Sequence, residues 1–245
     1  MDSTHVGDAA DPDRTPVAAG RARAGGPVAG PAALVTALVT ACHPGPAAAV
    51  TVLVTALAVA AGHTPAGCAL VAGAVLTGQL SVGWCNDAFD AARDAAAGRR
   101  GKPVAAGAVL PRTAWTAAGA ALALCVPLSL AVGPLAGAVH LAGVAAAWAY
   151  DLRWKATVWS WFPYAVGFAS LPAFVALGLP GRPWPAWWTV LAAALLGVGA
   201  HLADTLPDFA ADRATGVRGL PHRLGASAVR RALPAVLVAA TAVLV

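Results

Sequence analysis

The sequence contains no glutamate and little charge of any kind. All 11 acidic residues are aspartates, and charged residues make up 11% of the chain. A typical soluble domain has about 25% charged residues. Apolar residues make up 59%, and the mean hydropathy is +0.70. This composition excludes an ordinary soluble domain and indicates a protein that crosses a membrane several times.

Signals for several other classes of protein are also missing. The four cysteines have no C-x-x-C spacing, so the sequence predicts neither a zinc site nor a redox pair. The net charge of +5 would suit a nucleic acid, but the basic residues fall in short loops between apolar segments, so we predict no nucleic-acid partner. Residues 1–30 lack the apolar core of a signal peptide, and their composition predicts a disordered cytoplasmic tail.

Apolar stretches of roughly 20 residues, the length that crosses a bilayer, recur along the rest of the chain. We predict an all-α fold, a polytopic membrane helical bundle of about seven transmembrane helices, with residues 31–245 forming a single transmembrane domain. The motif His43-Pro44-Gly45-Pro46 interrupts the first stretch, so 31–42 is expected to be interfacial or half-buried. The last stretch is still apolar at Val245, which suggests a truncated C-terminus. The predicted segments are 31–61, 66–86, 112–131, 134–150, 158–179, 186–206 and from 226 onward.

Basic residues concentrate in alternate loops between these segments. The loops after the second, fourth and sixth segments contain most of the lysine and arginine, whereas those near 61–66, 131–135 and 180–186 contain only Arg182. Basic loops stay in the cytoplasm when a membrane protein is inserted. We therefore predict a multi-pass protein of the cell membrane with its N-terminus and basic loops facing the cytoplasm.

Six of the seven aspartates beyond the N-terminal tail form two clusters, and Asp151 is the seventh. Asn86 is followed by Asp87, Asp90 and Asp94, and the second cluster is Asp204, Asp208 and Asp212. Residues three, four and seven apart lie on one face of an α-helix, so each cluster forms a stripe of carboxylates. Pro207 is expected to kink the sixth predicted helix or to mark where it unwinds. One acid at a helix end is usually solvated, but two such triads in an acid-poor chain require another explanation.

Stacked carboxylates repel one another unless a cation lies between them. Mg²⁺ takes oxygen ligands, commonly one or two carboxylates together with phosphate oxygens of a substrate. All six aspartates of the two clusters are therefore candidate metal ligands. The chemistry they suit is the binding of a diphosphate through Mg²⁺.

Four further residues are candidate diphosphate ligands. The chain has two lysines, Lys102 and Lys155, and each follows a helix that ends on the cytoplasmic side. Lysine neutralises phosphate charge that metal ions leave uncompensated. Asn86 adds a neutral oxygen or orients a carboxylate, and the hydroxyl of Tyr150 can donate to a phosphate, although tyrosine also favours membrane interfaces. The histidines have no metal-ligand spacing, and we assign them no role.

The two halves of the chain resemble a distant repeat. Each has a helix that ends in an aspartate cluster, a basic loop with glycine and proline, and a new apolar helix. Gly-Arg-Arg-Gly-Lys-Pro at 98–103 corresponds to Gly-Val-Arg-Gly-Leu-Pro at 216–221.

From about residue 43 onward the sequence resembles the UbiA superfamily of intramembrane prenyltransferases. The family's first motif, N-D-x-x-D-x-x-x-D, matches residues 86–94, and its second, D-x-x-x-D-x-x-x-D, matches residues 204–212. The stretch from Tyr150 to Lys155 resembles the family's tyrosine–lysine element. Lys102-Pro103 resembles an Arg-Pro that often follows the first motif, with lysine in place of arginine.

The resemblance implies a membrane bundle of about nine helices, of which this sequence reaches the seventh. It also implies a transferase that moves an isoprenyl group from a prenyl diphosphate to a small, aromatic acceptor with Mg²⁺ as cofactor. The prenyl chain would lie among small and apolar side chains of the helices, in a space that opens toward membrane lipid. Asp87, Asp90, Asp204 and Asp208 would be catalytic, through the metal and the departing diphosphate.

Two other functions fit the same residues. A terpene cyclase of this superfamily would act on the prenyl diphosphate without an acceptor. A transporter would use intramembrane carboxylates as an ion pathway, although these acids lie at helix ends and none is near mid-bilayer. The sequence leaves open the acceptor, the prenyl length and the oligomeric state. A CDP-alcohol phosphotransferase is excluded because its D-G-x-x-A-R element is absent.

Overall fold

A computed structural model of the chain describes residues 30–245. The predicted disordered tail lies outside the described residues, apart from Gly30. The described part of the chain folds into helices joined by short turns and contains no strand, which confirms the all-α prediction. In chain order the elements are α1 (Pro31–Ala41), α2 (Pro44–Ala60), α3 (Pro65–Ala96), α4 (Pro111–Val132), α5 (Pro134–Leu152), the 3₁₀ turn η1 (Trp154–Ala156), α6 (Trp161–Leu177), α7 (Trp187–Ala214), α8 (Leu220–Leu224) and α9 (Ala226–Ala242).

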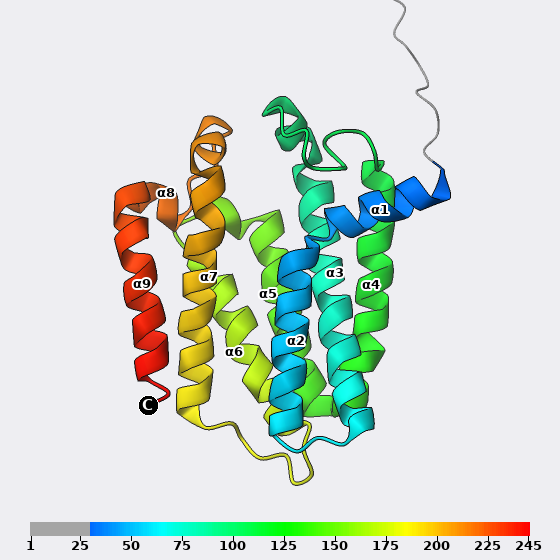
Figure 1. Cartoon of the computed structure of the whole chain (residues 1–245), viewed down its shortest axis with the longest axis vertical. Coiled ribbons are helices and arrows are strands. Elements are labelled where there is room, and N and C mark those ends of the chain that lie inside the picture. The colour runs from blue at the N-terminus through cyan, green and yellow to red at the C-terminus, as the bar shows by residue number, and fades with distance from the viewer. Residues whose placement is uncertain (1–29) are drawn as a thin grey trace, which may run out of the picture.

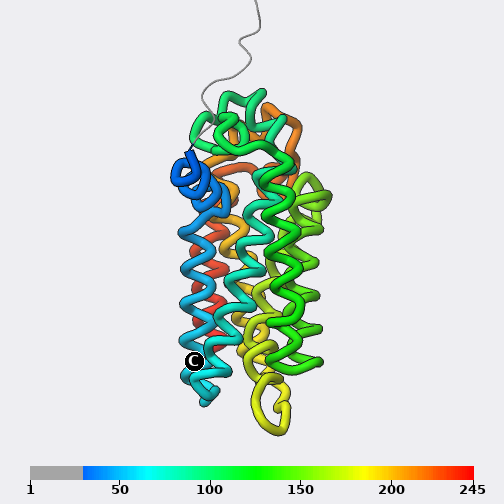
Figure 2. The backbone as a smooth tube through the Cα atoms, turned by 90° about the vertical axis from the view of Figure 1, so that its right-hand side faces the viewer, coloured from blue at the N-terminus to red at the C-terminus, as the bar shows by residue number. Residues whose placement is uncertain are grey.

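The long helices stand side by side along one axis, as the two views in Figures 1 and 2 show. Helices that follow one another in sequence pack against each other, and α3 contacts α2, α4 and α5. α1 lies across one end of this bundle, and α8 connects α7 to α9 at the same end (Figure 1). Large apolar side chains such as Leu53, Leu124 and Val238 are exposed on its flanks. Apolar flanks of this kind suit a lipid environment.

Four of these helices are long and apolar enough to cross a membrane: α3, α4, α5 and α7. The pair α1 and α2 would count as a fifth span, although the two are bent by 65°. α6 is apolar but has 17 residues, and α9 also has 17. The chain is thus a multi-pass bundle, while length and composition do not establish the predicted count of seven spans.

Prolines set many of the helix starts. Proline fits the first turn of a helix because its missing N–H would have no partner there and its φ angle is already helical. The predicted starts at 31, 66, 112 and 134 lie within one residue of such prolines, whereas α6 begins at Trp161, three residues after the predicted 158. The helices that begin with a proline are α1, α2, α3, α4 and α5.

The two helices with aspartate clusters are longer than the apolar pattern predicted. α3 continues beyond residue 86 to Ala96, and α7 continues beyond residue 206 to Ala214. The expectation that α7 unwinds at Pro207 is wrong, because the helix runs through this proline for two further turns. Proline removes one backbone hydrogen bond, and the surrounding helix retains the others. Both clusters therefore lie entirely on helix.

α3 and α7 end in the same way, in agreement with the predicted repeat. Gly98 and Gly216 have φ angles of +68° and +85°, in the left-handed region that glycine adopts without strain. The amide of the residue after each glycine bonds back to the carbonyl of the last aspartate, Arg99 N to Asp94 O at 2.9 Å and Val217 N to Asp212 O at 2.8 Å. This C-terminal motif turns each basic loop back toward its own carboxylates.

The break between α1 and α2 is held directly against α3. His43 is at the break with a φ of +55°, where the sequence predicted an interruption. A Cβ atom on Gly83 would lie 2.4 Å from the carbonyl oxygen of Cys42, so the two backbones touch. Nearby, the indole nitrogen of Trp84 donates to the carbonyl of Leu38 at 2.8 Å. These contacts fix His43 beside the first aspartate cluster.

The half of the bundle away from the aspartates is solidly packed. Phe174 and Leu177 of α6 are fully buried there against valines and alanines of α2 and α3, including Val54, Val71 and Val75. The interior is therefore polar at one end and apolar at the other.

We predict that Gly83→Ala destabilises the protein. The added methyl group would overlap the Cys42 carbonyl and separate α3 from the α1–α2 break, at a cost of about 1–3 kcal/mol. The measurement is thermal unfolding in detergent. Gly119→Ala in α4 is the matched control, because nothing lies within 4 Å of its Cβ position. Equal melting temperatures for the two variants would contradict the close approach.

Candidate active site

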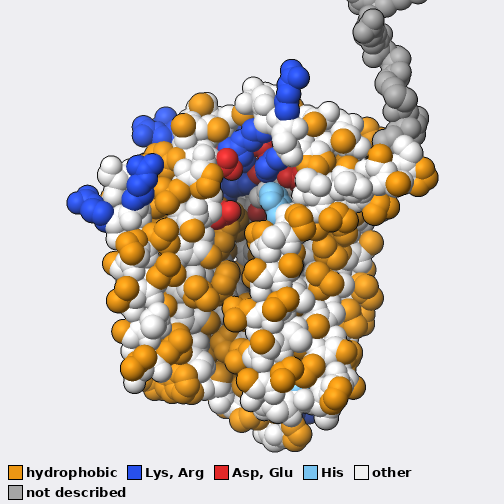
Figure 3. Space-filling model, viewed as in Figure 1, with side chains coloured by type: hydrophobic (Ala, Val, Ile, Leu, Met, Phe, Trp, Pro, Cys, Tyr) orange, Lys and Arg blue, Asp and Glu red, His pale blue; other side chains and the backbone are white. Residues whose placement is uncertain are grey.

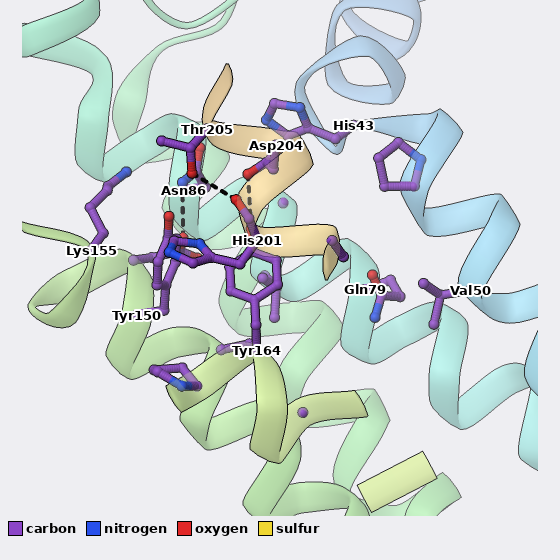
Figure 4. Close-up of a pocket in the computed structure, with 18 of the residues that line it drawn as sticks. His43, Val50, Gln79, Asn86, Tyr150, Lys155, Tyr164, His201, Asp204 and Thr205 are labelled. Atoms are coloured by element: carbon purple, nitrogen blue, oxygen red, sulfur yellow. Dashed lines mark hydrogen bonds between the residues drawn. The ribbon is translucent and has the colours of Figure 1, made fainter. Parts of the chain in front are cut away.

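A cavity of about 540 Å³ lies between α2, α3, α5, α6 and α7. In Figure 3 the molecule is hollowed beneath a group of acidic and basic side chains at one end, while its sides are mainly apolar. Figure 4 shows Asn86, Tyr150, Lys155, Tyr164 and Asp204 around the upper part of this cavity. The structure thus brings the two aspartate clusters, which are more than 100 residues apart in sequence, to the same space.

The first cluster is almost completely buried. Asp87, Asp90 and Asp94 are 2%, 2% and 1% exposed. Carboxylates at this depth need compensating cations, because an unpaired buried charge is very costly. Lys102, from the loop after α3, supplies one: its Nζ lies 2.9 Å from Asp94 Oδ2 and 3.3 Å from Asp87 Oδ1.

Two further cations hold Asp90. Arg93, one turn later on α3, donates to Asp90 Oδ2 at 2.6 Å. Lys155, from η1, donates to the same oxygen. Both lysines of the chain therefore contact the first cluster, as the sequence led us to expect of a shared site.

The second cluster is more open and has different partners. Asp204 accepts a hydrogen bond from Tyr164 of α6 at 2.8 Å (Figure 4). The Asp208 side chain is 50% exposed, and Asp212 is partly buried. Asp212 Oδ2 also lies 3.6 Å from His222 Nε2. Burial lowers the pKa of His222, although the charge of Asp212 opposes this effect.

Arg99 connects the two clusters. Its guanidinium donates to Asp208 at 3.0 Å and to Asp212 at 3.2 Å, and it lies 3.5 Å from Asp94 Oδ1. Arg99 is the residue that follows the terminating glycine of α3, so that turn aims its side chain across the cavity toward α7. One arginine thus neutralises carboxylates from both halves of the repeat.

Asn86 and Tyr150 also line the cavity. Asn86 donates to Asp151 Oδ1 at 2.9 Å and its own Oδ1 lies 3.5 Å from Lys102 Nζ. The ring of Tyr150 packs edge-on against Tyr164 with centroids 4.9 Å apart, and both rings contact the imidazole of His201. Asp151 is buried, and its Oδ2 has no hydrogen-bond partner.

The oxygen atoms present here are those that a hard divalent cation prefers. Both oxygens of Asp87 and Asp94 Oδ2 are buried and accept no hydrogen bond, although Lys102 lies within ion-pair distance. In the described part of the chain no three metal-ligating side chains converge as they now stand. Arg99 and Lys102 occupy the space between the carboxylates, so a metal ion would bind as these side chains move aside.

Lys102 remains charged in this setting. Burial lowers its pKa, but the charges of Asp87 and Asp94 outweigh this effect and raise the pKa above the ordinary value for lysine. The side chain is therefore a permanent positive charge that can be transferred from the carboxylates to an anionic ligand.

Several residues of the site had no assigned role in the sequence analysis. Tyr164 was missed, although the chain has only two tyrosines and both lie in this cavity. His43 lies 3.6 Å from Asp87, and His201 lines the cavity with its Nδ1 buried and unpartnered. Arg99 was noted for its charge alone. His201 lies one helical turn before Asp204, and this spacing was the sequence signal that could have identified it as a site residue.

Comparisons with known proteins agree with this geometry. Residues 47–245 match the UbiA prenyltransferase family. Over 173 residues the chain is 35% identical to the bacteriochlorophyll synthase 33 kDa chain of Cereibacter sphaeroides. That match covers 62% of this chain and 54% of the relative, so the chain spans about half the length of this curated relative.

Solved structures with the same fold come from a UbiA homologue of Archaeoglobus fulgidus. The form bound to GPP and Mg²⁺ has a TM-score of 0.68 and 18% identity, and covers 84% of this chain and 76% of that chain. The form bound to DMAPP and Mg²⁺ has the same TM-score and identity, with coverages of 84% and 75%. At this identity the similarity shows a shared fold.

We predict that Arg99→Gln lowers stability by on the order of 1 kcal/mol, because Asp94, Asp208 and Asp212 lose a shared cation, while water screens the exposed part of the interaction. The measurement is thermal unfolding of the purified protein without divalent cations. Arg100→Gln is the control, since the Arg100 side chain is exposed and forms no ion pair among residues 30–245. If both variants unfold at the same temperature, Arg99 does not bridge the clusters.

Proposed function

Because the chain belongs to the UbiA prenyltransferase family, we propose that it transfers an isoprenyl group from a prenyl diphosphate to a small aromatic acceptor. The observation that carries this proposal is the cavity itself. Two carboxylate clusters and two lysines meet at its polar end, and its other end continues into an apolar bundle. A prenyl diphosphate has the same division between a highly charged head and a long apolar tail.

The six clustered aspartates would hold Mg²⁺, and the unpartnered buried oxygens of Asp87 and Asp94 fit that role. When bound, the metal supplies Lewis-acid stabilisation of the departing diphosphate. The Archaeoglobus fulgidus homologue of the same fold has been solved with GPP and Mg²⁺ and with DMAPP and Mg²⁺. Asp87, Asp90, Asp204 and Asp208 are the aspartates that we propose to be essential for catalysis.

The chain's own residues perform the remaining tasks. Lys102 and Lys155 now neutralise aspartates, and they would turn to the diphosphate, whose charge is larger. Asn86 and Tyr150 would add hydrogen bonds from the wall. As the bond between the allylic carbon and oxygen breaks, the electron pair leaves with the diphosphate. The acceptor then forms a bond to that carbon and loses a proton.

The allylic carbon would lie just below the carboxylates, at the level of Tyr150, Tyr164 and His201 (Figure 4). These three rings contact one another and provide flat surfaces for an aromatic acceptor. Water must be kept away, because it would capture the carbon as it gains positive charge. The basic loops support an orientation in which this end of the bundle faces the cytoplasm.

We expect Asp87→Asn and Asp208→Asn to reduce prenyl transfer by about a hundredfold or more, because each removes a negative ligand of the diphosphate–metal assembly. The measurement is transfer of radiolabel from prenyl diphosphate in membranes. EDTA should abolish the activity of the unchanged protein, and added Mg²⁺ should restore it. Full activity in both variants would exclude the proposed mechanism.

Product analysis with the donor alone distinguishes the competing functions. A terpene cyclase would release a cyclic hydrocarbon or alcohol without any acceptor, whereas a transferase would form no such product. Net movement of substrate across proteoliposomes without chemical conversion would instead indicate a transporter.

Lys155→Gln should also lose most of the transfer activity, since it removes one of two lysines at the diphosphate end. Arg153→Gln is a close control, because Arg153 is two residues away, exposed, and without an ion pair in the described chain. Apparent donor affinity should fall for Lys155→Gln alone. Equal losses in the two variants would point to a general effect of charge in this loop.

A further inference from the structure

The loop between α7 and α8 is seated on the segment that carries Lys155. A Cβ atom on Gly219 of this loop would lie 2.6 Å from the carbonyl oxygen of Lys155 and 2.9 Å from Oγ of Ser160, so the backbone of the loop touches both residues. The amide of Leu220 donates to Ser160 Oγ at 2.9 Å, across 60 residues of sequence. Ser160 is completely buried, and Gly219 lines the cavity. Two distant segments therefore meet at the backbone of a lysine of the site.

Ser160 is also bonded to α7. Its Oγ lies 3.0 Å from Nε2 of His201, which is itself buried. The hydroxyl has a single proton, and the amide of Leu220 already donates to the oxygen, so the proton is available for Nε2. One buried hydroxyl thus joins the residue before α6, the middle of α7 and the loop that follows α7. Its removal would leave two buried polar groups without a partner.

The residues from Lys155 to Ser160 form a continuous series of turns. The 3₁₀ turn η1 contains Lys155 and is closed by Thr157, whose amide and hydroxyl bond to the carbonyl of Trp154 at 3.0 Å and 2.9 Å. The amide of Ser160 in turn donates to the carbonyl of Thr157 at 3.2 Å. A displacement of Ser160 is therefore passed on to the backbone of Lys155 rather than absorbed by a slack loop.

The backbone of Lys155 decides where its ammonium group lies. The side chain is 12% exposed, and Nζ donates to Asp90 in the first aspartate cluster. A side chain that is enclosed in this way has few rotamers open to it. A shift of the backbone would therefore move the ammonium with it and away from the polar end of the cavity.

The corresponding loop in the first half of the chain is built differently. In the repeat, Gly101 and Lys102 occupy the places of Gly219 and Leu220. Nothing lies within 4 Å of the Cβ position of Gly101, and this loop supplies its own lysine to the site. The loop after α7 has a leucine at that place, and its backbone touches Lys155 instead. Close packing at Gly219 is thus particular to the second loop and not a consequence of the shared motif.

From these contacts we propose that Ser160 and Gly219 are positioning residues, which seat the loop after α7 against the backbone of Lys155 and so hold its ammonium at the diphosphate end of the cavity. The inference rests on the proposed function and adds two residues that act through Lys155. The loop that follows the second aspartate cluster then sets the position of a lysine that contacts the first.

The test measures binding of the non-hydrolysable geranyl and geranylgeranyl thiolodiphosphates, each with Mg²⁺, to the full chain in nanodiscs. Ser160→Ala removes the shared hydroxyl, and Gly219→Ala places a methyl group against the carbonyl of Lys155. We expect each variant to bind about threefold to tenfold more weakly, because the lysine ammonium is no longer held in place. Unchanged affinity in both variants would overturn the proposal.

Combination with Lys155→Gln distinguishes positioning from a general loss of structure. If Ser160 and Gly219 act through Lys155, neither Ser160→Ala nor Gly219→Ala weakens binding further once the ammonium is gone. Losses that multiply in the double variants would show that the two residues act independently of Lys155, which contradicts the proposal.

Gly101→Ala is the matched control. It adds the same methyl group at the corresponding place of the first loop, where the space is open. We expect both its affinity and its melting temperature to equal those of the unchanged protein. A loss of affinity as large as that of Gly219→Ala would speak against a specific contact with Lys155. If Gly219→Ala fails to fold, Ser160→Ala makes the same test alone, because it adds no atoms.

The result also separates this inference from the one beneath it. Failure of the unchanged protein to bind either diphosphate with Mg²⁺ would remove the proposed prenyltransferase function, and the positioning with it. Binding by the unchanged protein, with equal affinity in Ser160→Ala and Gly219→Ala, would leave that function standing and remove only the positioning.

Discussion

Three carboxylates buried in a membrane bundle are the constraint on which the rest of this structure depends. Asp87, Asp90 and Asp94 are almost inaccessible to water, and in such surroundings their negative charges are tolerated only beside cations. Lys102 and Lys155 are brought to them from two separate loops. The long helices, the terminating glycines and the basic loops all serve to place positive charge within reach of these acids.

The same arrangement prepares the site for an anionic ligand. The cations already line the cavity and are partly buried, so positive charge would be in place when a diphosphate binds. Arg99 holds Asp94 of one half of the chain and Asp208 of the other, and in doing so keeps the two aspartate stripes facing each other. Preorganisation of this kind is possible because the helices that carry the stripes end in matched glycine turns at Gly98 and Gly216.

The residues that line the cavity become less polar with distance from the aspartate clusters. Three levels can be distinguished, and each has a physical reason. The upper level contains the two aspartate clusters and both lysines, and the charged head group of the proposed substrate would fit there. The middle level, with Tyr164 and His201, combines aromatic surface with polar atoms and suits the reacting carbon and its acceptor. The lower level is lined mainly by apolar and small residues, and the close-packed core around Phe174 lies beyond it.

The sequence by itself determined the membrane class, the helical bundle, the helix starts at proline and the stripe on which each aspartate cluster lies. These features are local: periodicity and composition act within one helix or one span. Tertiary structure alone decided that Tyr164 reaches Asp204 and that Arg99 crosses from α3 to α7. It also showed that α7 continues through Pro207 rather than unwinding. These outcomes depend on how distant helices pack and on where loops direct long side chains, and no short-range pattern contains that information.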